Sequence, residues 1–194
     1  MTWDPYLDLE HGVLRNRLGI TDAGALARVE SNVASLRIAE LALNPLQGRY
    51  DLALLQSMHW HIFADVYAWA GQLRSVSIGK GRPFCPPQEI PARGEAIFAG
   101  LAARDHLYGL HRRAFVHGLA DLFARLNHLH PFREGNGRTQ RLMLSHIGRD
   151  AGYDIDWARL DPELNISASR AALDGDDTAL REVLTGLVRP ADRG

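Results

Sequence analysis

The sequence has only one cysteine, Cys85, among its 194 residues. A single thiol excludes an intramolecular disulfide and a metal centre built from several cysteines. Long apolar runs are also missing, and none approaches the ~20 residues that a membrane-spanning helix requires. We therefore expect neither a disulfide-stabilised fold nor a membrane protein.

The chain also has no excess of charge of either sign. The 22 lysines and arginines stand against 23 aspartates and glutamates, so the formal net charge is -1. This balance gives no electrostatic reason to expect nucleic acid or an anionic membrane as a direct partner. The first ten residues include Asp4, Asp8 and Glu10, where a secretory signal peptide has basic and then apolar residues. We therefore expect a cytoplasmic protein.

Hydrophobic residues make up 46% and charged residues 23% of the chain, as is usual in globular proteins. Apolar residues recur at helical spacing in seven stretches, which predicts an all-α helical bundle that forms one domain over residues 1–194. The predicted helices lie near residues 22–44, 51–69, 90–103, 113–129, 136–147, 161–173 and 178–188.

Residues 72–86 interrupt the helical pattern. Short β-compatible segments flank Gly79, Lys80 and Gly81, which predicts a small hairpin. We expect this hairpin to be the only strand structure of note, apart from a short extended link near residues 153–157.

The densest chemistry of the chain lies in residues 130–141, which read HPFREGNGRTQR. Pro131 ends the preceding helix directly after His130. Gly135 and Gly137 permit backbone angles and close approaches that a side chain forbids, and Asn136 is a good N-cap for the next helix. The sequence therefore predicts a helix, a tight loop and a second helix.

This arrangement suits a polyphosphate and a proton transfer. The free N–H groups and the dipole of a helix N-terminus favour a bound phosphate, and Arg138 and Arg141 project from the same turn. Glu134 is the one carboxylate of the loop, and one carboxylate together with phosphate oxygens commonly holds Mg²⁺. His130 is neutral enough near pH 7 to act as a general base. The other reading is a plain helix–loop–helix with solvated arginines.

The stretch resembles the signature of the Fic family, His-Pro-Phe-x-acidic-Gly-Asn-Gly-Arg-x-x-Arg, at every specified position. The resemblance implies a Fic-fold helical bundle with a core near residues 50–150, a β-hairpin flap and helical flanks at both ends. It further implies a protein adenylyltransferase, which transfers AMP from ATP to a hydroxyl side chain of a target protein.

The same resemblance implies roles for individual residues. His130 deprotonates the target hydroxyl and Glu134 holds Mg²⁺. The phosphates of ATP contact Gly135, Asn136 and Gly137, while Arg138 and Arg141 take the distal phosphates.

The segment from Tyr67 to Phe84 resembles the family's flap, which aligns the target by strand pairing. Lys80 and Phe84 are therefore candidate target-binding residues. The alternative is an exposed hairpin with a solvated lysine.

Many Fic proteins carry an inhibitory helix whose pattern is Ser or Thr, three residues, Glu, and then Gly or Asn. Thr178 and Glu182 have that spacing, but Val183 departs from the pattern. The resemblance therefore favours the toxin branch, in which a small antitoxin supplies a glutamate that engages Arg141. Known targets in that branch are type II topoisomerases, DNA gyrase and topoisomerase IV.

Three alternatives stay open at this point. One is transfer of a different phosphate-linked group, or of the γ-phosphate as in the related Doc kinases, although those kinases alter the glycine loop that is intact here. Another is a non-catalytic nucleotide-binding adaptor, which would need neither His130 nor Glu134.

Finally, His59 and His61 suggest a metal pair, but residues two apart on a helix point to different sides, which favours simple packing.

Overall fold

The computed structural model describes residues 4–80 and 82–191. Within that part of the chain, seven α-helices form a bundle that carries three short antiparallel strand pairs, which confirms the predicted all-α fold class. The helices are α1 (Ala23–Leu43), α2 (Leu52–Phe63), α3 (Ile90–Ala102), α4 (Arg112–Leu129), α5 (Asn136–Asp150), α6 (Pro162–Leu173) and α7 (Thr178–Leu187).

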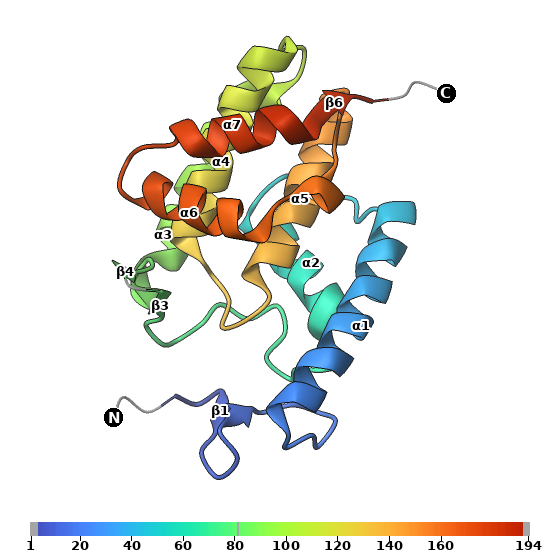
Figure 1. Cartoon of the computed structure of the whole chain (residues 1–194), viewed down its shortest axis with the longest axis vertical. Coiled ribbons are helices and arrows are strands. Elements are labelled where there is room, and N and C mark those ends of the chain that lie inside the picture. Colours follow the sequence, from blue (N-terminus) through green and yellow to red (C-terminus); the bar gives the residue numbers. More distant parts are fainter. Residues whose placement is uncertain (1–3, 81, 192–194) are drawn as a thin grey trace.

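Helices α4 and α5 lie at the centre of the bundle (Figure 1). Helix α4 contacts α3, α5, α6 and α7, whereas α5 also contacts α2. The buried face of α4 carries Phe115, Leu119, Leu122, Phe123 and Leu126 at the predicted helical spacing. Burial of such a side chain contributes about 2 kcal/mol, so the two helices that flank the motif stand on the best-packed part of the fold.

Most predicted helix boundaries hold within a few residues, and α1 begins as expected. The carboxylate of Asp22 accepts a hydrogen bond from the N–H of Ala25, 2.7 Å away, which satisfies one donor of the first turn. Asp51 caps α2 in the same way through the N–H of Leu54.

The predicted end of α2 was wrong, because the helix stops at Phe63 and not at Trp69. A series of turns follows, and it buries Val66, Tyr67, Trp69 and Ala70 together. A continued α-helix would have distributed these side chains around its axis. The turns end at Gly71, whose φ is +76°.

The hairpin exists, but it was wrong to expect no other strand pair. Strands β3 (Gly79–Lys80) and β4 (Arg82–Pro83) form the hairpin. A second antiparallel pair is β1 (Leu7–Asp8) with β2 (Val13–Leu14), and a third is β5 (Tyr153–Ile155) with β6 (Val188–Pro190). The third pair turns the predicted extended link into a strand that ties the end of α7 to the chain after α5.

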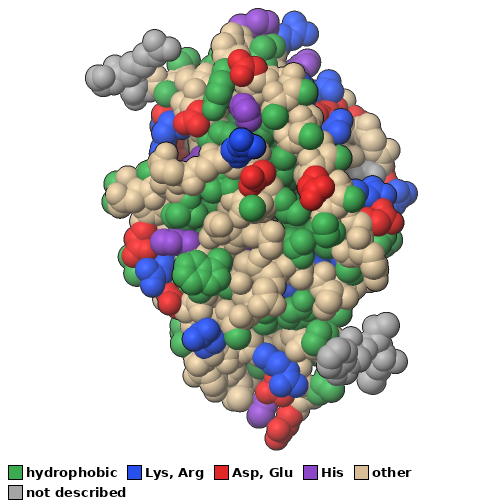
Figure 2. Space-filling view, turned by 180° about the vertical axis from the view of Figure 1, so that it is seen from behind, with side chains coloured by type: hydrophobic (Ala, Val, Ile, Leu, Met, Phe, Trp, Pro, Cys, Tyr) green, Lys and Arg blue, Asp and Glu red, His purple; other side chains and the backbone are tan. Residues whose placement is uncertain are grey.

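Acidic and basic side chains alternate on the surface seen from behind, and no large patch of one sign appears there (Figure 2). None of the described helices combines the length and the apolar character that crossing a lipid bilayer would demand.

Candidate functional site

The loop between α4 and α5 has the predicted helix–loop–helix form, and its first residue has an unusual backbone. His130 directly follows α4 and adopts a left-handed conformation with a φ of +42°. A non-glycine residue in this region stores strain of order 1–3 kcal/mol, so the surrounding contacts must hold it there. This bend turns the imidazole out of the helix and into a pocket.

Asn136 is not the N-cap that the sequence suggested. Gly135 takes that position with a φ of +79°, and Asn136 is the first residue of α5. The Asn136 side chain instead accepts a hydrogen bond from the N–H of Phe132 at 2.9 Å and donates one to the Phe132 carbonyl at 2.8 Å. The side-chain amide therefore connects the start of α5 to Phe132 within the loop, and it does not bind the first-turn N–H groups as a capping residue would.

Gly135 is required by space as well as by its backbone angle. A Cβ atom at this position would lie 2.3 Å from a ring carbon of Phe63. The glycine thus lets the start of α5 rest directly on α2.

A buried histidine supports the loop from below. His59 is fully buried, and its Nδ1 accepts a hydrogen bond from the N–H of Gly71 at 2.8 Å. Its Nε2 must then carry the proton, which it donates to the Glu134 carbonyl at 3.0 Å. Burial lowers the pKa of His59 to about 4, so the ring is neutral near pH 7. Both ring nitrogens are hydrogen-bonded to backbone atoms, so His59 has a structural role and is not a metal ligand paired with His61.

A buried arginine ties the loop to the base of the hairpin. The guanidinium of Arg74 is 2% exposed and donates to the carbonyls of His130, Val76 and Cys85 at 2.6–2.8 Å. In addition, the Arg74 N–H donates to the Pro131 carbonyl. The hairpin is therefore fixed relative to His130 by charge-assisted hydrogen bonds to the main chain.

These elements enclose a cavity of about 590 Å³, which we call the motif pocket. The motif contributes His130, Glu134, Asn136, Gly137 and Arg141 to its wall, and the hairpin segment contributes Ser77, Ile78, Gly79 and Phe84. The pocket thus brings together six of the predicted site residues, five from the motif and Phe84 from the segment expected to form the flap.

His130 presents one ring nitrogen as an acceptor. Its Nδ1 lies 3.2 Å from the Asn127 carbonyl, which can only accept, so Nδ1 carries the proton and the Nε2 lone pair is basic. Phe84 stacks on the imidazole, with the ring centroids 3.8 Å apart and the planes 4° apart. This stacking fixes the ring orientation. Phe84 is only 9% exposed, so its face toward a target is small.

The two motif arginines differ in their partners. Arg138 forms an ion pair with Glu30 of α1, and its guanidinium lies over the ring of Phe63 at 4.7 Å. Arg141, in contrast, lines the motif pocket, and within the described part of the chain no carboxylate lies at ion-pair distance from it. Burial, together with the charge of Arg138, lowers the pKa of Arg141 below its usual value. A partly buried cation in this state favours a bound anion.

Glu134 is suited to hold a metal ion. Its side chain is 46% exposed, and Oε1 accepts from the N–H of Gly135 at 2.8 Å and lies 3.5 Å from Arg138. One or two accessible carboxylates, together with phosphate oxygens, are the usual ligands of Mg²⁺ in nucleotide sites.

Three predicted residues are not among those that line the motif pocket: Gly135, which is the N-cap of α5, Arg138 and Lys80. Arg138 does not line the motif pocket, because Glu30 draws it toward α1. The side chain of Lys80 lies outside the described residues, although its backbone belongs to β3.

Sequence reasoning missed Glu30, Tyr67 and Arg74. A charged residue on the apolar face of α1 was a signal for Glu30, but no local pattern names its partner.

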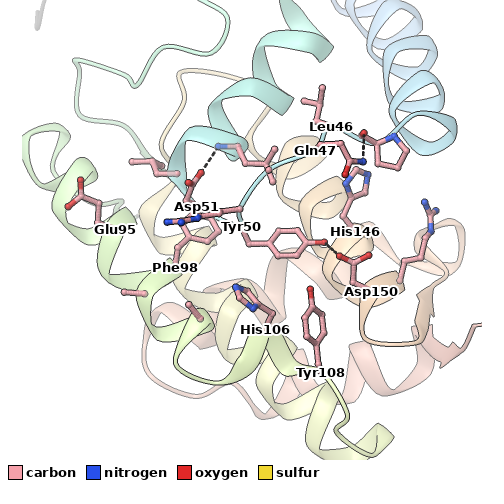
Figure 3. A pocket seen from close by; sticks show the side chains of 18 residues that line it. Leu46, Gln47, Tyr50, Asp51, Glu95, Phe98, His106, Tyr108, His146 and Asp150 are labelled. Carbon is pink, nitrogen blue, oxygen red and sulfur yellow. Dashed lines mark hydrogen bonds between the residues drawn. The ribbon is translucent and has the colours of Figure 1, made fainter.

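A second cavity of about 720 Å³ lies elsewhere, and it contains none of the predicted site residues. Figure 3 shows it between the segment before α2, helix α3 and the end of α5; we call it the α2–α3 cavity. The Tyr50 hydroxyl donates to Asp150 at 2.6 Å, and His106 lies between Tyr50 and Tyr108. His146 has a buried Nε2 that finds no hydrogen-bond partner among the described residues, and burial lowers the pKa of this imidazole.

The fold and the motif pocket define a class: a helical protein in which a helix N-terminus, an arginine and an imidazole line one pocket. Residues 49–147 match the model of the Fic/DOC family. The chain belongs to this family.

Individual relatives agree with this assignment. Protein adenylyltransferase VbhT of Bartonella schoenbuchensis is 39% identical over 96% of the chain, which spans only 38% of the length of VbhT. The probable protein adenylyltransferase Fic of Escherichia coli is 35% identical over 97% of the chain and 94% of its own length. The crystal structure of BepC from Bartonella tribocorum, with bound AMPPNP, superposes with a TM-score of 0.90 at 25% identity, covering 96% of this chain and 97% of that one.

Proposed function

We propose that the chain is a protein adenylyltransferase that transfers AMP from ATP to a hydroxyl side chain of a target protein. A new bond forms between the target oxygen and the α-phosphorus, while the bond from that phosphorus to the β-phosphate bridging oxygen breaks. Pyrophosphate leaves, and the hydroxyl proton passes to the enzyme. The names of VbhT and Fic, and the nucleotide analogue bound to BepC, support this assignment.

The observation that carries the proposal is the pairing of Arg141 with His130 in one pocket. Arg141 is a partly buried cation without a carboxylate partner among the described residues, and the first-turn N–H groups of α5 lie beside it. Both features favour a polyphosphate. His130 lines the same pocket, and nucleotide binding alone needs no base.

In the proposed reaction, each residue has a defined task. Arg141 and the N-terminus of α5 hold the β- and γ-phosphates, which fixes the α-phosphate in the direction of His130. The Nε2 of His130 takes the hydroxyl proton as the oxygen attacks. The Nδ1–H bond to Asn127 and the stacked ring of Phe84 keep the imidazole in the reactive tautomer and orientation.

Glu134 would hold Mg²⁺ in this site. The ion would neutralise negative charge on the phosphates and on the leaving pyrophosphate. The half-exposed carboxylate and its backbone hydrogen bond fit that role, because one oxygen is oriented and the carboxylate stays accessible.

The hairpin would receive the target. Phe84, directly after β4, and residues 77–79, which lead into β3, line the motif pocket, and Arg74 ties this segment to His130. An extended target segment paired with the hairpin would present its hydroxyl at a set position through main-chain hydrogen bonds. We assign Phe84 and Lys80 to this surface, with residues 1–194 acting as one domain.

The test uses ATP labelled separately at the α and γ positions, incubated with Mg²⁺ and bacterial lysate. Protein labelling from the α position alone is the expected result, and labelling from the γ position would identify a kinase instead. We expect His130→Ala to abolish labelling, a loss of about 10²- to 10⁴-fold, while ATP still binds in calorimetry. If ATP binding disappears with His130, the histidine is structural and the base assignment fails.

We further propose that the protein acts in the cytoplasm as a toxin that a small antitoxin restrains by placing a glutamate on Arg141. Glu182 is exposed on α7, and no ion pair joins it to Arg141 in the part of the chain that the structure describes. DNA gyrase and topoisomerase IV are the proposed targets. Labelling of purified gyrase, and its loss with a gyrase that lacks the acceptor hydroxyl, would test this assignment. Activity that appears only after Glu182→Ala would show internal inhibition instead.

A further inference from the structure

Glu30 is a buried carboxylate on α1, a helix for which the sequence indicated packing alone. The residue is 8% exposed. One of its oxygens accepts from Nη2 of Arg138 and the other from the hydroxyl of Tyr67. Since an unpaired buried carboxylate costs several kcal/mol, these two partners are what allow the charge to stay inside the fold.

Arg138 stands between two carboxylates. Nη2 contacts Oε1 of Glu30 on one side and lies 3.5 Å from Oε1 of Glu134 on the other. The ring of Phe63 covers the face of the guanidinium at 4.7 Å. The two acids differ in setting, because the side chain of Glu30 is 10% exposed and that of Glu134 is 46% exposed.

We infer that Glu30 is a positioning residue, which holds Arg138 against α1 and thereby leaves the carboxylate of Glu134 free to bind Mg²⁺. This inference rests on the proposed function, since it assigns Glu134 to the metal. Without Glu30, the guanidinium would keep its charge and lose its nearest anion. Glu134 is then the closest carboxylate, and a two-bond pair with Arg138 would compete with the metal for the same oxygens.

Tyr67 completes the arrangement. Its hydroxyl donates to Glu30, and burial together with the Glu30 charge raises the pKa of the phenol, which therefore stays protonated. The bond fixes the carboxylate so that the other oxygen faces Arg138. Glu30 would therefore not bind the metal ion itself. It would act through Arg138, as residues do that orient a metal ligand without touching the metal.

The decisive experiment measures the Mg²⁺ dependence of nucleotide binding by calorimetry, with AMPPNP as the probe. For Glu30→Gln, we expect the Mg²⁺ concentration at half-maximal effect to rise about tenfold, the size of change typical of residues that orient metal ligands. AMPPNP binding in EDTA should change less than twofold. Tyr67→Phe should shift the Mg²⁺ dependence in the same direction by a smaller factor, and it provides a second variant if Glu30→Gln folds poorly.

Two controls separate positioning from general damage. Glu40→Gln removes another acid of α1, whose carboxylate pairs with Arg37 at 2.9 Å, and should leave the Mg²⁺ dependence unchanged. Adding Glu30→Gln to Arg138→Ala should produce no further shift, because the competing guanidinium is already absent.

The outcomes are distinct. A Glu30→Gln protein that melts like the wild type and shows less than a twofold Mg²⁺ shift overturns the inference, as does a full shift in the Arg138→Ala background. If the Mg²⁺ shift appears but no α-label reaches a protein, the positioning role stands and the proposed transfer fails. If AMPPNP binding to the wild-type protein does not depend on Mg²⁺, both the positioning role and the proposed transfer are contradicted.

Discussion

The motif pocket and the α2–α3 cavity are similar in volume, about 590 and about 720 Å³, but they differ in how their polar groups are satisfied. In the larger cavity, Tyr50 donates to Asp150 and Asp51 caps α2. In the motif pocket, Arg141 lies beside the N-terminus of α5 and has no carboxylate at ion-pair distance among the described residues. A partly buried arginine beside a helix N-terminus, and not volume, therefore distinguishes the candidate active site, and the following predictions compare the two regions directly.

Gly135→Ala should cause the largest change. Its Cβ would clash with Phe63 at 2.3 Å and would impose a φ of +79° on an alanine, so we expect a loss of about 3–4 kcal/mol in unfolding free energy. Gly109→Ala, next to Tyr108 of the α2–α3 cavity, has a φ of +67° but open space and should lose only about 1–2 kcal/mol. Urea denaturation measures both, and equal losses would refute the steric argument.

The next prediction concerns acid stability. Burial lowers the pKa of His59 to about 4, whereas an unfolded chain titrates near 6.5. The unfolded state therefore binds more protons between these values, so the stabilisation is complete above pH ~6.5 and is lost as the pH falls through ~4, by about 3 kcal/mol in all. His59→Gln should flatten this part of the curve of unfolding free energy against pH.

His146 provides the comparison for His59 in the other region. Its pKa is also lowered by burial, but no hydrogen bond from its ring to the motif loop is present among the described residues. His146→Gln should leave ATP affinity unchanged, whereas His59→Gln should weaken it through the Glu134 backbone. An unchanged pH curve for His59→Gln would mean that another group governs acid unfolding.

Arg141→Ala should weaken ATP binding by about 10- to 100-fold, because a charge-assisted hydrogen bond to phosphate contributes about 1.5–3 kcal/mol. The matched variant is Arg149→Ala at the α2–α3 cavity, which should change ATP affinity less than twofold. Calorimetric titration with ATP tests both. Similar losses for the two variants would indicate long-range charge and not a contact.

The motif was predictable from the sequence because its chemistry is local. His130, Glu134 and Arg141 lie within twelve residues, and the helical spacing on either side fixes where they point. The predicted cap at Asn136 failed because its amide found the backbone of Phe132, a partner within the same loop that only the folded bend brings close.

The supporting residues were not predictable, for a physical reason. Glu30 is 108 positions from Arg138 in sequence, and Arg74 donates to the carbonyls of His130, at the end of α4, and of Cys85, after the hairpin. Such contacts depend on how α1 and the hairpin pack against α5. Local periodicity identifies the faces of helices but does not identify which charged residue meets which.

The smallest effect is expected for Tyr50→Phe in the α2–α3 cavity. The substitution removes the 2.6 Å hydrogen bond to Asp150, which lies at the surface end of α5, so we expect a loss of only about 1 kcal/mol in unfolding free energy. AMP transfer should stay within twofold of the wild type, because no motif residue lines this cavity. A tenfold loss of transfer, at unchanged stability, would mean that the cavity communicates with the motif pocket through α5, and the separation of the two regions would then have to be abandoned.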